Sequence, residues 1–429
     1  MRKTQLLLAL AAIGFTGSAF ATDGYFSHGN GMIAKGMGGA ATAMAEDTFG
    51  GANNPASMVW VGNRIDLGAE LFSPHRSADR SGGSGALSGS ADSDMKYFVI
   101  PEFGYNRMIN TDLSLGLSVY GNGGMNTSYS GGQLDAFNCN QGHGPHGPAN
   151  MLCGSGQLGI NLMQLIIAPT AAYKINDSHS IGISPLFGYQ RFKASGLDMF
   201  KNFSSEPNNV TDNDSDHASG WGVRVGWQGR ITPTLTLGAA YSSKIDMSKF
   251  NSYSGLFADG GKFDIPENYN LGLAFKAMPN LTLALDYQRI NYGGVAAVAN
   301  SSMNSLNFTG ANQLGTSNGS GFGWKDVNVW KLGAEYMLDD KLTLRAGYNH
   351  TDNPIQSADV TINIMAPGVV QEHLTLGMSY AVSKTSDLTL AYMHAFKHSV
   401  SGPDALDPSA TTTIKMYQDS LGVAYSWKL

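Results

Sequence analysis

Reactive side chains at chemically useful spacings are rare in this sequence. The run from Gly315 to Gly319, Gly-Thr-Ser-Asn-Gly, matches the nucleophile-elbow pattern of hydrolases. That elbow requires a strand before the serine and a helix after it, whereas this run lies in a segment rich in Gly, Ser and Asn. We therefore expect no catalytic residues and no enzymatic activity.

Cys139 and Cys153 are the two cysteines among the 429 residues. If the chain is exported to an oxidising compartment, we expect a disulfide between them, which closes a loop of about fifteen residues and contributes roughly 3 kcal/mol in the chain-entropy model. His143 and His146 lie inside this loop, but two histidines without a third ligand do not make a metal site. We expect neither a metal nor a cofactor.

The N-terminus predicts export. Residues 1–21 contain two basic residues after Met1, an apolar run over 6–15, and the small-residue cleavage site Ala19-Phe20-Ala21. The apolar run is too short for a membrane helix, which needs about 20 residues. We expect a signal peptide over 1–21 and a mature chain that begins at Thr22.

The composition excludes helical membrane spans and nucleic-acid binding. The chain is 42% hydrophobic and 14% charged, has 54 glycines, and contains no long apolar run after the signal segment. Its net charge is -6 and its basic residues are not clustered, whereas nucleic-acid phosphates require Lys or Arg. Low charge, abundant Gly and Tyr, and export favour a secreted β protein or an outer-membrane barrel.

Apolar and polar residues alternate with a period of two in many segments, as in β-strands with two different faces. Over 235–242, the apolar phase ends in Tyr241; the segments 281–288, 342–348 and 374–380 repeat this design. A soluble sandwich would also bury such a face. Charges that lipid would not tolerate lie in the other phase: Glu102, Arg224, Asp286, Lys331, Glu335 and Arg345.

Connection lengths favour the barrel, because short and long connections alternate along the chain. Fourteen antiparallel strands with short turns at one end and long loops at the other are typical of outer-membrane barrels. The short turns are at 110–112, 176–179, 232–234, 278–280, 338–340 and 383–386, and the long loops at 74–94, 126–162, 194–220, 249–262, 291–325, 352–368 and 398–409.

A fourteen-stranded barrel encloses a lumen too wide for wall side chains alone to fill. Residues 22–60 precede the first strand and are rich in Gly and Ala, with an expected short helix over 40–47 and an extended Asn54-Pro55 dipeptide. We expect this segment to form a plug inside a barrel that comprises residues 61–429.

Two kinds of residue are candidates to bind a ligand. Apolar residues in the second and third long loops suggest a groove, although they would equally serve to pack the loops together: Leu162, Leu165, Phe200 and Phe203. A carboxylate would match a guanidinium, with Arg345 favoured over Arg224 and Arg191. The alternative is that lumen charges pair with each other, or that Arg345 tethers the acidic end of the plug.

Three groups of motifs occur in order over most of the mature chain. The plug contains Gly36, Gly39 and Ala40-Ala41, then Ala45-Glu46-Asp47 and Asn54-Pro55-Ala56. Tyr120-Gly121 is followed by Thr127, Tyr129, Gly131 and Gly132, and Leu344-Arg345-Ala346-Gly347-Tyr348 by Asn353-Pro354-Ile355. Together they resemble the outer-membrane long-chain fatty-acid transporter (FadL) family, including the related aromatic-hydrocarbon uptake proteins.

The resemblance implies a monomeric, plugged barrel in the bacterial outer membrane that transports hydrophobic compounds, most directly long-chain fatty acids. In this family a ligand binds among the extracellular loops, enters the barrel, and leaves sideways where the third strand bends, while the plug shifts. This implies a plug gate at Asn54, Pro55 and Ala56 and a strand kink at Gly121, Gly123 and Gly124, although these glycines would also suit the start of a loop.

The expected partners are therefore a hydrophobic small molecule and the outer membrane with its lipopolysaccharide, and no nucleic acid. Two alternatives remain: an uptake channel for aromatic or aliphatic hydrocarbons, and a general porin without a hydrophobic ligand.

Overall fold

The computed structural model describes residues 23–83, 87–134, 139, 148–305 and 310–429. The predicted signal peptide, His143 and His146 lie outside these residues.

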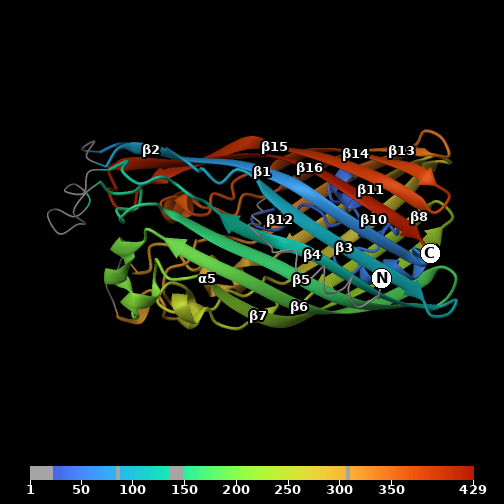
Figure 1. Ribbon diagram of the computed structural model, residues 1–429, viewed down its shortest axis with the longest axis horizontal. Helices are drawn as coiled ribbons and strands as arrows, with labels where there is room; N and C mark the ends of the chain where they lie inside the picture. The colour runs from blue at the N-terminus through green and yellow to red at the C-terminus, as the bar shows by residue number, and fades with distance from the viewer. Residues whose placement is uncertain (1–22, 84–86, 135–138, 140–147, 306–309) are drawn as a thin grey trace, which may run out of the picture.

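Antiparallel strands form a closed barrel, as predicted (Figure 1). Of the sixteen strands in the described residues, two are short additions: β2 (Gly89–Asp92), which pairs with β1, and β9 (Asp246–Met247), which pairs with β7. The other fourteen form the wall, and β1 closes it against β16 over its whole length. The wall strands are β1 (Arg64–Gly82), β3 (Phe98–Met108), β4 (Leu113–Asn126), β5 (Gly159–Lys174), β6 (His179–Ser195), β7 (Asp216–Thr232), β8 (Leu235–Ser242), β10 (Asn268–Met278), β11 (Leu281–Ile290), β12 (Val327–Met337), β13 (Leu342–Thr351), β14 (Glu372–Ser383), β15 (Ser386–Pro403) and β16 (Ala410–Lys428).

All six predicted short turns join consecutive wall strands. The first long connection is shorter than expected, because β1 continues to Gly82 and pairs with β2 and β16. The connection from β8 to β10 is longer, from Ser242 to Asn268. The helices in the described parts of the loops are short: η2 (Asp198–Phe203), η3 (Pro207–Asn209), η4 (Asn251–Tyr253), α4 (Ala258–Gly261), η5 (Tyr292–Gly294), α5 (Ala296–Ala299), η7 (Gly310–Asn312), η8 (Ser357–Asp359) and η9 (Ile362–Ile364).

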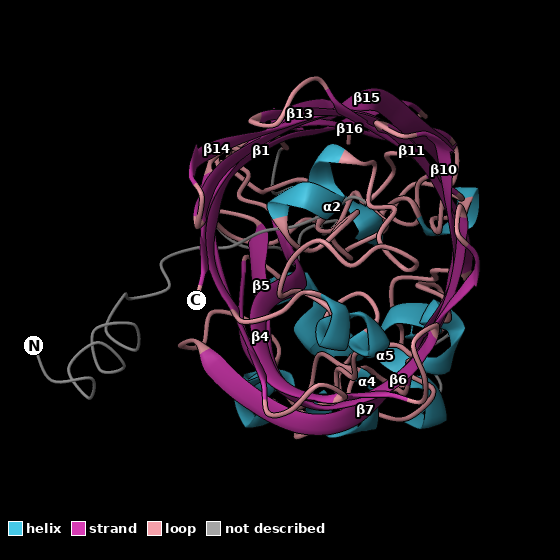
Figure 2. Cartoon of the chain, turned by 90° about the vertical axis from the view of Figure 1, so that its right-hand side faces the viewer, coloured by secondary structure: helices cyan, strands magenta, loops and turns pink. Residues whose placement is uncertain are grey.

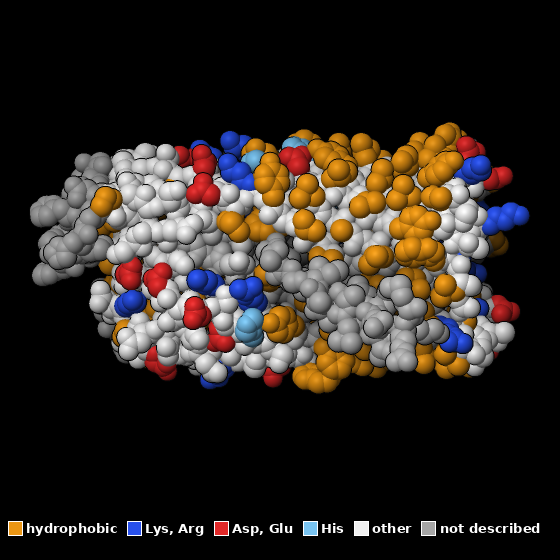
Figure 3. All heavy atoms as spheres, in the orientation of Figure 1, with side chains coloured by type: hydrophobic (Ala, Val, Ile, Leu, Met, Phe, Trp, Pro, Cys, Tyr) orange, Lys and Arg blue, Asp and Glu red, His pale blue; other side chains and the backbone are white. Residues whose placement is uncertain are grey.

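The two faces of the wall separate apolar from charged side chains. Leu283, Leu285, Leu374 and Leu376 are exposed on the outside, where Figure 3 shows a broad belt of hydrophobic side chains. The six charged residues predicted to avoid lipid are all buried inside. No helix among the described residues is both long and apolar enough to cross a membrane.

The N-terminal segment lies inside the barrel, where Figure 2 shows α2 (Met32–Gly36) surrounded by the wall. The helix predicted over 40–47 is wrong: the plug helices are α2 and η1 (Pro55–Trp60). A wall side chain supplies hydrogen-bond partners that the backbone would otherwise have within a helix: the Asp286 carboxylate accepts hydrogen bonds from the N–H groups of Ala41 and Thr42. Close packing also requires small wall residues, because a Cβ on Gly238 would lie 2.1 Å from the Thr42 oxygen.

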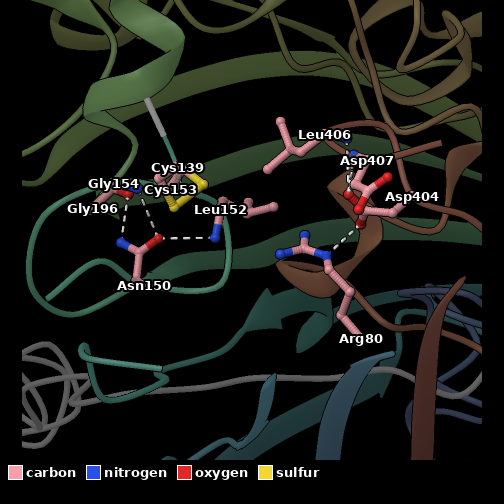
Figure 4. Close-up of a disulfide and its surroundings, with 10 residues drawn as sticks. All are labelled: Arg80, Cys139, Asn150, Leu152, Cys153, Gly154, Gly196, Asp404, Leu406 and Asp407. Atoms are coloured by element: carbon pink, nitrogen blue, oxygen red, sulfur yellow. Dashed lines mark hydrogen bonds and ion pairs between the residues drawn. A yellow bond between two sulfur atoms is a disulfide. The ribbon is translucent and has the colours of Figure 1, made fainter. Parts of the chain in front are cut away.

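The long loops are held together near the disulfide that joins Cys139 and Cys153 (Figure 4). The Asn150 side chain accepts hydrogen bonds from the N–H groups of Leu152 and Gly154 and donates one to the Gly196 carbonyl. Nearby, Arg80 at the end of β1 forms a fully buried ion pair of 2.8 Å with Asp404. These contacts join the loop before β5 to the loop after β6, and the end of β1 to the loop after β15.

Candidate ligand-binding site and wall opening

An apolar cavity lies among the long loops, with about 590 Å³ of space between atoms, part of it open to solvent. Three serines supply its polar groups, and no charged side chain lines it among the described residues. The lining residues come from strands and loops far apart in the sequence: Ile160, Phe192, Leu197, Phe200, Phe203, Leu256, Phe257, Ala297, Ser302, Ser305, Leu314, Ser320, Gly321, Phe322, Ile362 and Met365.

Aromatic packing shapes one wall of this cavity. The Phe192 ring on β6 lies 4.7 Å from that of Phe257 and 4.8 Å from that of Tyr253, both in the loop before β10. The Tyr253 hydroxyl donates to the Asn213 carbonyl and accepts from the Ala194 N–H, so it ties this loop to both ends of another. The cavity wall is therefore preformed.

The structure separates the apolar residues that the sequence grouped together. Phe200 and Phe203 line the cavity, and Leu162 is buried among the same hydrophobic residues. The expectation for Leu165 is wrong, because the alternation of β5 places it in the outward phase with Ile167. Phe257 was not predicted, although an adjacent Leu256-Phe257 pair in a polar loop was a usable signal.

The three candidate arginines lie apart from the apolar cavity. Arg191 is exposed on the outward face of β6, in the same phase as Phe187 and Tyr189, so it does not line the cavity as a partner for a carboxylate. Arg345 forms a 2.7 Å ion pair with Glu335, as expected from the alternative in which lumen charges pair with each other. Arg224 donates a hydrogen bond to the Gly51 carbonyl of the plug.

A second, polar cavity lies between the plug and the wall, with about 430 Å³ of space between atoms, part of it open to solvent, and Arg224 and Lys331 both line it. Lys331 donates a 3.0 Å hydrogen bond to the His28 carbonyl. Amide side chains supply much of the remaining lining: Asn30, Asn53, Asn122, Asn270 and Gln288. This cavity is therefore suited to an anion or to water, in contrast to the apolar cavity.

A chain of aromatic rings runs from the apolar cavity to the first described residues of the plug. The Phe257 ring lies 5.0 Å from that of Phe263, which lies 6.1 Å from that of Tyr25. Tyr25 also packs against Trp324 at 5.8 Å, and its N–H donates to the Tyr292 hydroxyl. The N-terminal segment thus contacts the inner side of the cavity region.

The wall is interrupted where this segment meets it. Pairing between β3 and β4 ends at Phe103 and Val119, and β4 continues beyond that point without β3. The pairing of β4 with β5 shifts between Gly121 and Gly123, which identifies a bulge at the predicted kink. The plug supplies substitute hydrogen bonds, from the Ser27 N–H to the Asn122 carbonyl and from the Gly124 N–H to the Tyr25 carbonyl.

The Asn54-Pro55-Ala56 motif attaches the other end of the plug to the wall. The Asn54 amide donates to the carbonyls of Thr42 and Trp227, at 2.8 and 2.9 Å, while its oxygen accepts from the Ala56 N–H and caps η1. A Cβ on Gly226 would lie 2.0 Å from the Asn54 oxygen, so the wall is shaped to fit this side chain.

Comparisons with known proteins agree with this geometry. A family model described as outer membrane protein transport protein (OMPP1/FadL/TodX) matches residues 9–426. No curated protein matches the sequence.

Solved structures with the same fold have low sequence identity. The toluene transporter TodX of Pseudomonas putida is 18% identical, with a TM-score of 0.70 over 94% of this chain and 99% of that one. The toluene transporter TbuX of Ralstonia pickettii is 18% identical, with a TM-score of 0.65 over 93% and 98%. A FadL homologue of Pseudomonas aeruginosa is 15% identical, with a TM-score of 0.67 over 94% and 99%.

Proposed function

This chain belongs to the outer membrane protein transport protein family (OMPP1/FadL/TodX), and we propose that the hydrophobic compounds it transports are chiefly neutral hydrocarbons. The observation that carries this proposal is the apolar cavity, whose described lining has no charged side chain to meet a carboxylate. Burying an unpaired carboxylate costs several kcal/mol, roughly, whereas a neutral ring or alkyl chain has no such cost. The toluene transporters with the same fold are consistent with this class.

The proposed route begins in this cavity and follows the aromatic rings inward to Tyr25. From there, displacement of the N-terminal segment would free the β4 bulge at Gly121, Gly123 and Gly124 and allow a ligand to leave sideways into the membrane. The loss of β3 pairing beyond Val119 supports this exit, because no wall ladder has to break there. The attachment of Asn54, Pro55 and Ala56 would limit how far the plug moves.

Long-chain fatty acids are the second candidate, supported by a different observation. Arg224 and Lys331 line the polar cavity beside the plug, where a carboxylate would find two cations. In that case the alkyl chain would extend from the polar cavity toward Tyr25 and the aromatic rings. The role expected for Arg345 is not part of this proposal, since Glu335 already occupies its guanidinium.

Transport of either ligand requires binding and diffusion without a covalent step, so we propose a passive, monomeric conduit with no enzymatic activity. The Gly315–Gly319 run supports this view, because it lies in a loop without the strand and helix that an elbow serine needs.

The test is direct titration of the purified protein with toluene and with oleate, in a detergent that does not mimic either ligand. Phe200→Ser places a hydroxyl in the apolar cavity, and Phe396→Ser is its matched control on the outer surface of β15. Arg224→Gln removes one cation from the polar cavity.

The hydrocarbon proposal predicts saturable toluene binding that weakens about tenfold in Phe200→Ser and is unchanged in Phe396→Ser and Arg224→Gln. Oleate binding that weakens in Arg224→Gln, with no saturable toluene binding, would instead establish the fatty-acid candidate. Steady conductance of small hydrophilic solutes without binding of either ligand would favour a general porin.

A further inference from the structure

The outward face of β6 changes from apolar to basic toward the extracellular end. Ile181, Ile183 and Tyr189 are exposed in the outward phase, and the next two outward residues are Arg191 and Lys193. Figure 3 shows basic side chains where the belt of hydrophobic side chains ends. The change is sharp, because it occurs between consecutive residues of one face.

The strand register extends this change across three strands. Phe187 lies opposite Ile167 of β5 and Trp221 of β7, and the rings of Phe187 and Trp221 are 3.9 Å apart. Four residues farther along β6, Arg191 lies opposite His217 of β7. Four residues span about 13 Å, or about 10 Å along the membrane normal for a strand tilted by about 40°. An aromatic row at the membrane interface would therefore place Arg191 among the lipid headgroups.

The two cations are available for a ligand. No acid forms an ion pair with Arg191 or Lys193 in the described part of the chain, and Arg191 donates only to the Ser215 hydroxyl, at 3.0 Å. The adjacent acid, Asp216, already accepts from the backbone N–H groups of Ser252 and His217. The other side of the barrel differs, since Lys415 is paired there with Asp79 at 2.6 Å.

We propose that Arg191 and Lys193 bind a phosphate of lipid A, the anchor of lipopolysaccharide, with its acyl chains on the apolar rows at Ile167 and Phe187. A guanidinium binds phosphate through two parallel hydrogen bonds, and an adjacent ammonium adds charge. His217, which shares a 2.6 Å hydrogen bond with the Tyr189 hydroxyl, borders this site. Continuity with the lipid-facing belt selects a membrane lipid over a soluble anion, and the proposal does not depend on what the barrel transports.

The test measures binding of bisphosphorylated lipid A to the purified full-length protein in detergent, by native mass spectrometry. Arg191→Ser with Lys193→Ser removes the site, Lys415→Ser removes a paired outer-face cation as the matched control, and Arg191→Lys with Lys193→Arg keeps the charge. A difference in gel mobility between heated and unheated samples establishes that each barrel is folded. If the double serine variant does not fold, Arg191→Gln and Lys193→Gln are measured singly.

Each basic residue near a lipid surface contributes about fivefold, so the double serine variant is expected to bind about 25-fold more weakly and the single variants about fivefold. Lys415→Ser and the charge-keeping variant should bind like the wild type. Equal binding by the wild type and the serine variant, or equal binding of dephosphorylated lipid A, would overturn the proposal. So would displacement of lipid A by equimolar inorganic phosphate, because the site would then recognise a free anion.

Discussion

The backbone N–H of Gly124 donates a 3.2 Å hydrogen bond to the carbonyl oxygen of Tyr25. This bond joins the beginning of the plug to β4 at the place where β4 no longer pairs with β3. The plug therefore completes the wall here as well as filling the lumen. Any motion of the N-terminal segment must break this contact, which makes the contact accessible to mutation.

Gly123→Ala should displace the N-terminal segment, because a Cβ on Gly123 would lie 1.9 Å from the Tyr25 oxygen. Backbone cannot yield as a flexible side chain can, so Tyr25 must move. We expect toluene uptake into vesicles to be several-fold faster than in the wild type. Gly294→Ala is the control, since a Cβ there meets nothing within 4 Å. Unchanged uptake in a folded Gly123→Ala barrel would exclude this segment as the barrier.

The barrel was predictable from the sequence because each wall strand repeats one local rule. Consecutive residues face opposite sides of the wall, so that Leu285 faces outward and Asp286 faces the lumen. Lipid favours apolar side chains on one side and the lumen favours polar ones on the other. The turns followed from the same rule, since alternation stops where a strand leaves the membrane.

The plug and the cavity depend on partners distant in the sequence. The Ala-rich run at 40–47 has helical propensity, but the Asp286 carboxylate and the Asn54 amide bind its backbone in an irregular conformation with a turn at Thr42-Ala43. Phe192 of β6 and Phe257 meet only because the loop before β10 folds against β6. The position of Arg191 could have been predicted, because the expected loop begins only at 194 and Arg191 shares the phase of Phe187 and Tyr189, which faces outward.

Asn54→Ala should loosen the plug. The substitution removes hydrogen bonds to the Thr42 and Trp227 carbonyls and the cap of η1, and leaves buried backbone groups without partners. Each such loss costs about 1–3 kcal/mol, so hydrogen exchange of residues 40–60 should accelerate at least tenfold. Asn280→Ala, in an exposed turn, is the control. If exchange, ligand affinity and pore conductance all match the wild type, Asn54 does not hold the gate.

Lys35→Met should destabilise the plug through the two acids that it leaves behind. Lys35 contacts Glu70 at 2.5 Å and Glu102 at 3.7 Å, and all three side chains are buried. Removing one partner of such a pair costs about 3–5 kcal/mol. Adding Glu70→Gln and Glu102→Gln to Lys35→Met should restore much of this loss, as measured by the proteolysis rate of the plug. The absence of rescue would mean that Lys35 acts through packing alone.

Docking of the plug should weaken as the pH rises from about 5 to about 7. Burial, followed by repulsion from Asp66, raises the pKa of Asp47 from 3.8 to about 7, while the Phe49 N–H and the nearby Arg64 oppose this rise. The docked state therefore holds a proton that the undocked state has lost, so stability falls with pH over this interval and is level above about 7. The fall should approach tenfold in hydrogen-exchange protection per pH unit. Residue 47 does not titrate in Asp47→Asn, whereas the other plug acids are present in both proteins. The difference in hydrogen-exchange protection between the wild type and the variant therefore reports on Asp47. A difference that does not change with pH would show that Asp47 is already ionised when the plug is docked.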